Sequence, residues 1–186
     1  MRVPIGDEAP RGQLNEVHEL NRLLQILTIA LVSGLWMQTA YGAAPVVESS
    51  SISSSNNTIS CTLTKDVNTV ADDLLIIVVS IDGTGDAITK PSASWNVLRA
   101  ESQDGGQTTA SWWLIAGAAE PGTYTASWTG NENFVGGIVR ISGADTVNPI
   151  NVSASSTGTG NPVAPAVTPT LDETRIIRFC GIDDDD

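Results

Sequence analysis

Residues 74–81, LLIIVVSI, form a nearly continuous apolar stretch rich in β-branched side chains. Asp72 and Asp73 precede it, and the turn-forming segment DGTGD at 82–86 follows it. A short apolar run between such boundaries is typical of a central strand that is buried on both faces of a sheet. Because such a strand needs neighbours on both sides, the rest of the chain should supply further strands.

Segments of strand-like character recur from Pro45 onward, with no convincing helical period of 3.6 residues. Turn residues separate them at spacings of roughly 10–15 residues, which favours hairpin-connected strands over alternating helices. The sequence therefore predicts an all-β fold of eight to nine strands, an antiparallel β-sandwich that is jelly-roll-like or immunoglobulin-like. The expected strands are 46–53, 57–64, 74–81, 94–100, 109–118, 123–129, 134–142 and 174–182, and the proline-containing segment 162–170 would be a ninth.

Residues 23–37, LLQILTIALVSGLWM, are the one long apolar run near the N-terminus. A membrane-spanning helix needs about 20 apolar residues, so this shorter run fits the hydrophobic region of a signal peptide, with Arg22 before it and small residues at 40–44 after it. The long, mixed-charge segment before it, with Glu16 and Glu19, leaves an uncleaved anchor or a packed globular helix open. We assign 1–43 to a signal or anchor segment and 44–186 to the β-domain, expected outside the cell or at its surface.

The chain carries a formal net charge of −12. Residues 1–43 hold three basic and four acidic residues, so the domain keeps six and seventeen, a net charge of −11. Affinity for nucleic acids comes mainly from Lys and Arg neutralising phosphates, so we expect no nucleic-acid partner. Contact with a membrane is expected only through the N-terminal segment, if it stays uncleaved.

The single histidine, His18, lies in the N-terminal segment. A domain without histidine cannot build a Ser-His-Asp site, a Cys-His site or a His-containing zinc site. What remains for catalysis is a pair of carboxylates, as in glycoside hydrolysis, but every candidate falls at or beside an expected turn. These candidates are Asp82, Asp86, Glu101, Asp104, Glu120 and Glu132. We therefore expect no enzymatic activity.

Three blocks in the chain have a familiar order. A Trp-x-Val-Leu-Arg segment at 95–99 precedes WWLIAGAAEPGTYTASW at 112–128, and GGIVRISGADTVNPI follows at 136–150. Over residues 45–186 this resembles β-sandwich modules that recur in bacterial secreted or surface proteins and in phage virion-associated proteins. The resemblance implies a building block of a larger assembly, with other protein modules as partners and no activity of its own. Similar chains continue beyond Asp183–Asp186, which leaves open that the domain is truncated at its C-terminus.

Four tryptophans fall within the domain: Trp95, Trp112, Trp113 and Trp128. Neighbouring residues of a strand point to opposite faces, so one of Trp112 and Trp113 should lie in the core and the other on the outer face. An exposed ring could stack on a sugar, which makes Trp112 and Trp113 candidate ligand-binding residues and surface glycans candidate partners. The alternative is that most of these rings fill the core.

Asp82 and Asp86 in the DGTGD segment place carboxylates at short spacing beside flexible glycines, which suits a hard cation such as calcium. The segment lacks the full loop of an EF-hand, and an ordinary hairpin turn explains it as well. No other cofactor is expected. Asp183–Asp186 form a second acidic run, of a kind more typical of a solvated tail.

Cys61 and Cys180 are the only cysteines, and they fall in the first and last parts of the expected sandwich. In an exported chain an even pair favours a structural disulfide, which for so long a loop would stabilise the fold by about 4–5 kcal/mol. Two separate thiols are the alternative. Taken together, the sequence predicts a non-catalytic structural or adhesive module, and its alternative is a carbohydrate-binding module that uses a tryptophan, with or without calcium.

Overall fold

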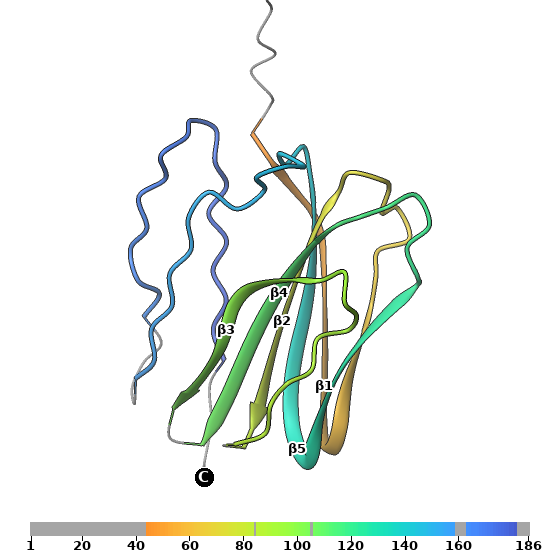
Figure 1. Ribbon diagram of the computed structural model, residues 1–186, viewed down its shortest axis with the longest axis vertical. Coiled ribbons are helices and arrows are strands. Elements are labelled where there is room, and N and C mark those ends of the chain that lie inside the picture. The colour runs from red at the N-terminus through yellow and green to blue at the C-terminus, as the bar shows by residue number, and fades with distance from the viewer. Residues whose placement is uncertain (1–43, 84, 105, 159–162, 182–186) are drawn as a thin grey trace, which may run out of the picture. The chain divides into compact units, whose positions relative to one another are not determined.

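The computed structural model describes residues 44–83, 85–104, 106–158 and 163–181, and residues 42–186 form one compact unit. The described chain is all-β, as predicted, and contains no helix. The strands are β1 (Val46–Thr64), β2 (Leu74–Asp82), β3 (Asn96–Asp104), β4 (Gln107–Ile115) and β5 (Thr123–Ser142). They form one sheet in the order β1-β5-β2-β4-β3, with every neighbouring pair antiparallel (Figure 1). The expected signal or anchor segment lies outside the described residues.

Five strands in one sheet replace the predicted sandwich of eight to nine, because two pairs of predicted strands are merged and the segments 162–170 and 174–182 form no strand where they are described. The predicted strands 46–53 and 57–64 are both part of β1, and 123–129 and 134–142 are both part of β5. The two long strands stay paired through register shifts around Thr58, where Asn57 adopts a left-handed φ of 55°. The polar residues around Thr58 resemble a turn in the sequence, but they lie within an irregular part of β1. The backbone pairs between β1 and β5 on either side of them keep the chain extended.

Strands β1 and β5 together form a U-shaped ribbon (Figure 1). One arm, residues 46–55 of β1 and 134–142 of β5, extends the main sheet beside β2. The other arm, 60–64 and 123–127, folds back over the sheet, and its buried side chains join the same core as those of β2 and β4. Thr89 adds a single bridge to Ser127 of this arm.

The main core lies between the folded-back arm and the sheet. Alternate residues of β2 (Leu75, Ile77, Val79 and Ile81) supply its floor and are almost completely buried. Aromatic rings fill the space above: Trp95 meets Tyr124 edge-on with ring centroids 5.0 Å apart, and Trp128 meets Phe134 at 5.6 Å. Each fully buried large side chain contributes about 1.5–3 kcal/mol, so the aromatics hold the arm on the sheet.

The opposite face of the sheet carries a second, smaller cluster made of Leu74, Ile76, Val139 and Ile141. Residues of the C-terminal segment 143–181 pack on it, including Ile150 and Ile177. Apart from residues 159–162, which are not described, this segment contains no helix or strand. Because both faces of β2 are covered, the prediction of a central strand buried on both sides is confirmed.

The predicted strand 174–182 is wrong over its described part, residues 174–181, which have no strand pairing. Side-chain contacts attach the C-terminal segment instead. The guanidinium of Arg99 donates to the Ser153 carbonyl, and Arg175 donates to the Pro45 carbonyl at 3.1 Å. A short run rich in apolar residues is therefore not enough to make a strand where the chain packs on the face of a sheet instead of pairing along its edge.

Candidate functional site

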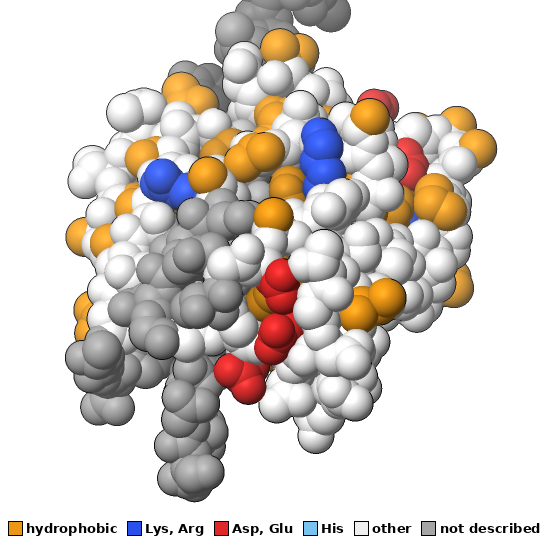
Figure 2. Space-filling view, turned by 60° about the horizontal axis from the view of Figure 1, so that its bottom comes forward, with side chains coloured by type: hydrophobic (Ala, Val, Ile, Leu, Met, Phe, Trp, Pro, Cys, Tyr) orange, Lys and Arg blue, Asp and Glu red, His pale blue; other side chains and the backbone are white. Residues whose placement is uncertain are grey.

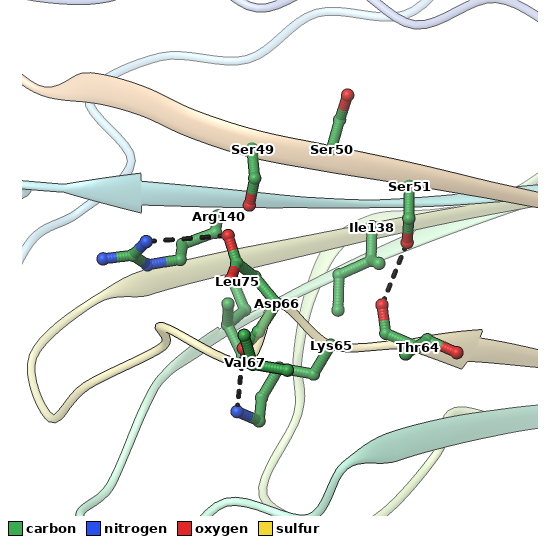
Figure 3. A pocket seen from close by; sticks show the side chains of 10 residues that line it. All are labelled: Ser49, Ser50, Ser51, Thr64, Lys65, Asp66, Val67, Leu75, Ile138 and Arg140. Atoms are coloured by element: carbon green, nitrogen blue, oxygen red, sulfur yellow. Dashed lines mark hydrogen bonds and ion pairs between the residues drawn. The ribbon is translucent and has the colours of Figure 1, made fainter.

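A depression opens between the two arms of β1, and we call it the β1 groove. Its cavity is about 280 Å³, slightly below the usual 300–1,000 Å³ of small-molecule sites. It is lined by Ser49, Ser50, Ser51, Thr64, Lys65, Asp66, Val67, Leu75, Ile138 and Arg140 (Figure 3). Figure 3 shows the hydroxyls of Ser49 and Ser51 directed toward the loop that follows β1, and that of Ser50 directed away.

The two arms of β1 are linked across the groove by polar contacts. The Ser51 hydroxyl donates to the Thr64 carbonyl at 2.9 Å, although the two residues are 13 positions apart. Ser49 hydrogen-bonds to Asp66, and this contact together with the Asn68 amide and the Arg140 charge lowers the pKa of the Asp66 carboxyl. The groove therefore lies where β1 folds back on itself, and serine hydroxyls of β1 connect its two sides.

Arg140 anchors one end of the groove. Its Nε donates to Asp73 Oδ2 at 2.7 Å, and its Nη1 lies 3.6 Å from Asp66 Oδ2. The Asp73 side chain is only 4% exposed and accepts a second bond from the Val70 amide at 3.0 Å. Because two carboxylates already engage Arg140, its charge is committed to holding the loop 65–73 on the sheet. Lys65, the other cation that lines the groove, donates from its Nζ to the Asp66 carbonyl at 3.0 Å.

A second polar site gathers the predicted residues Asp82 and Asp86 with Glu132, and we call it the acidic cluster. Asp86 accepts hydrogen bonds from the Thr129 hydroxyl and, at 3.1 Å, from the Gly130 amide. Asn133 donates to Asp82 at 3.3 Å. The turn after β2 therefore lies against the bend of the ribbon, and Figure 2 shows acidic side chains in a line at this end of the molecule.

Burial, the Asp86 and Asp82 charges and a hydrogen bond with Asp86 raise the pKa of the Glu132 carboxyl. The sequence signal for Glu132 was its place in the polar segment 130–133, but nothing there indicates that it meets the turn fifty residues earlier. Within the described residues no group of three or more His, Cys, Asp or Glu side chains is placed to hold a metal ion. The carboxylates are close enough to affect one another without forming a preformed calcium shell.

The tryptophans show which face of the sheet each ring occupies. Trp112 is 4% exposed in the main core, whereas Trp113 is half-buried on the opposite face, against the second cluster. The predicted division of the pair between two faces is therefore confirmed. Trp95 and Trp128 are also buried, at 1% and 5% exposed. None of the four rings presents a flat, open surface.

The predicted disulfide is absent, because Cys61 and Cys180 are both free thiols. They belong to opposite faces of the sheet. Cys61 is fully buried in the main core with Val79, whereas Gly181, the neighbour of Cys180, lies against Ser80, which points to the other face of β2. Burial raises the pKa of the Cys61 thiol to about 12, so it stays protonated, and Cys180 is exposed.

No helix among the described residues is long and apolar enough to cross a membrane. No family model, no curated protein and no solved structure matches the chain.

Proposed function

We propose that the chain is a non-catalytic structural or adhesive module, exported and displayed outside the cell within a larger assembly of protein modules. In this proposal the folded-back arm and the main sheet act as the two layers of a compact β-sandwich. The observation that carries the proposal is the placement of the aromatic rings: three of the four domain tryptophans are at most 5% exposed and hold the layers together.

The polar sites support the same proposal. Arg140 in the β1 groove is committed to Asp73 and Asp66, and Asp86 in the acidic cluster accepts bonds from the neighbouring ribbon. Both sites therefore join loops to the sheet. The domain holds no histidine to serve as a general base at neutral pH.

A carbohydrate-binding module remains the second candidate, and one observation favours it. Trp113 is half-buried at the second cluster, on which residues of the C-terminal segment also pack, and that segment has no strand pairing where it is described. Displacement of that segment would expose the ring for stacking on a sugar. Calcium bound at Asp82 and Asp86 could then order the turn after β2 in this second candidate.

A glycan-array screen of the full chain, with and without calcium, separates the two candidates. The structural proposal predicts no saturable binding in either condition. Saturable binding that is lost in Trp113→Ala, but kept in Leu98→Ala, would establish the second candidate instead. Leu98 is the matched control because it packs on the same cluster as Trp113 without an aromatic ring.

Calcium dependence is tested separately by thermal unfolding with and without the ion. A calcium-induced rise in Tm that disappears in Asp86→Asn but persists in Asp172→Asn, an acid of the C-terminal segment, would place calcium at the turn after β2. Export is tested by the mass of the secreted protein: the proposal predicts a mature chain that starts near residues 43–45, and a mass that includes residues well before Ala40 would contradict a cleaved signal.

A further inference from the structure

One edge of the sheet is open in the described structure. Strand β1 pairs only with β5, so its other edge has no partner among the described residues. From Ser49 to Thr64 the strand contains no charged residue and no proline. Natural sheets usually protect an exposed edge with charges, prolines, bulges or a covering segment, because its unpaired backbone groups readily accept another strand.

The opposite edge shows this protection. Strand β3 carries Arg99, Glu101 and Asp104 in its sequence and has two register shifts in its pairing with β4. Arg99 also ties it to the C-terminal segment through the Ser153 carbonyl. By contrast, β1 pairs with β5 in an unbroken register from Ser49 to Ser55. The β3 edge is therefore protected against the addition of another strand by charges and register shifts, whereas residues 49–55 of the β1 edge are not.

The regular part of β1 is symmetric. Residues 49–55 read SSSISSS, the same in both directions, with Ile52 at the centre. Ile52 is 77% exposed, and Val135 beside it on β5 is 41% exposed. In the register with β5, Ile52 faces Gly137 and Ser54 faces Val135, so the two apolar side chains lie diagonally on one face.

We propose that this edge pairs antiparallel with the same edge of a second copy of the chain, about a two-fold axis at Ile52. The pairing sets Ile52 against Ile52 and places a serine opposite a serine at every other position of 49–55. Serine pairs across antiparallel strands can share hydrogen bonds, and apolar pairs exclude water, so the edge is complementary to itself.

The charge distribution permits a second copy at this edge, although the net charge opposes contact elsewhere. The domain has a net charge of −11, so copies repel one another over most of their surface, and an uncharged edge is where they can meet closely. In the register centred on Ile52, Glu48 lies opposite Asn56 of the second copy, so no like charges face each other. The inference rests on the proposed function, because it supplies the contact by which such modules would assemble.

Cross-linking tests the register. Directly opposite residues of antiparallel strands have Cα atoms about 4.5–5.5 Å apart, within the range that a disulfide spans. In the full chain carrying Cys180→Ser, which removes the exposed native thiol, Ile52→Cys should form a disulfide-linked dimer on mild oxidation. Val97→Cys is the matched control: Val97 is 58% exposed on β3, and its variant should stay monomeric under the same conditions.

Sedimentation equilibrium of the full chain tests the affinity. Ile52→Lys places two like charges at the axis and should weaken self-association at least tenfold, whereas Val97→Lys should leave it unchanged. Both positions are exposed, so circular dichroism should show both variants folded. Equal cross-linking at the two positions, an unaffected Ile52→Lys variant, or a monomer at every concentration would overturn the self-pairing. A monomer in which the β1 amides that point away from β5 are protected from hydrogen exchange would instead show that the chain covers its own edge.

These outcomes are independent of the glycan screen. A monomer that binds no glycan would remove the self-pairing and leave the structural proposal standing. A dimer cross-linked through residue 52 that binds a glycan through Trp113 would support the self-pairing and would replace the structural proposal with the carbohydrate-binding module.

Discussion

The sulfur of Cys61 lies against the backbone of Gly136, so closely that a Cβ atom built on residue 136 would be 2.5 Å from it. Cys61 belongs to the folded-back arm of the ribbon, and Gly136 belongs to the arm in the main sheet. The contact therefore joins the two arms of the ribbon directly. Only a residue without a side chain at 136 lets a thiol fill the space between them.

Gly136→Ala should destabilise the fold by about 1–3 kcal/mol, the usual cost of overpacking a core. In a Cys61→Ala parent the same change should cost clearly less, because the obstructing sulfur is gone. Denaturant unfolding of the four proteins in this cycle measures the coupling. Gly137→Ala is the control, since its Cβ would meet the Ser51 carbonyl oxygen at an ordinary 3.6 Å. Equal losses of stability at 136 and 137 would contradict the close contact between the two arms.

Thiol labelling tests the assignment of the two cysteines. The native full chain should react at one thiol, Cys180, because Cys61 is buried with its pKa raised to about 12. Denaturation should expose the second thiol. Counting thiols with a chromogenic disulfide reagent, before and after denaturation, checks both statements, and Cys180→Ser should abolish the native reaction. A chain that shows no thiol until a reductant is added would restore the disulfide prediction.

Much of the sheet could be predicted from the sequence. The apolar run 74–81 identified the central strand, and the predicted strand 123–129 lies within β5 with Tyr124, Ala126 and Trp128 buried. What the sequence could not supply was pairing. Whether Asn57 ends a strand or lies within one depends on the backbone of β5, which local composition does not encode.

The prediction of the candidate sites was limited in the same way, because the sequence does not show which distant segments lie together. The prediction that Trp112 and Trp113 divide between two faces needed only the alternation of a strand, and it is confirmed. The disulfide prediction needed the faces of two segments far apart in the sequence, and it failed because Cys61 and Cys180 lie on opposite sides of the sheet. Glu132 joins Asp82 and Asp86 only through the bend of the ribbon.

Arg140→Met should destabilise the protein by about 3–5 kcal/mol, because it leaves the buried Asp73 carboxylate without its partner. Adding Asp73→Asn removes that charge and should recover part of the loss. Urea unfolding measures both. Arg175→Met, in the exposed C-terminal segment, serves as the control and should cost less than about 1 kcal/mol. A loss this small for Arg140→Met would show that its ion pairs behave as exposed ones.

Glu132→Gln should stabilise the protein at neutral pH. The pKa of Glu132 is raised in the folded state by burial and by Asp86 and Asp82, so its ionisation lowers stability as the pH rises through that value. The difference in Tm between the variant and the parent should therefore be positive at pH 7.5 and vanish as the pH falls below the ordinary range for Glu. Thermal melts across this interval check the prediction.

Asp145→Asn should change the stability at neutral pH in the opposite direction to Glu132→Gln. Backbone amides of Val147 and Asn148 lower the pKa of the Asp145 carboxyl. Its contribution to stability is therefore present at neutral pH and lost as the pH falls through the lowered value. This variant should be less stable than the parent at pH 7.5 and equal to it in strong acid. Parallel pH profiles for Glu132→Gln and Asp145→Asn would contradict the assigned environments.

The burial of the tryptophan rings is the central claim, and ¹⁹F NMR of the full chain labelled with 5-fluorotryptophan tests it most directly. Single Trp→Phe variants assign the five resonances, and the shift on changing H₂O to D₂O reports the access of water to each ring. We predict no solvent shift for Trp95, Trp112 and Trp128, and a partial shift for Trp113. A full solvent shift at Trp112 or Trp113 would mean an open aromatic platform, and would contradict the structural module in favour of a sugar binder.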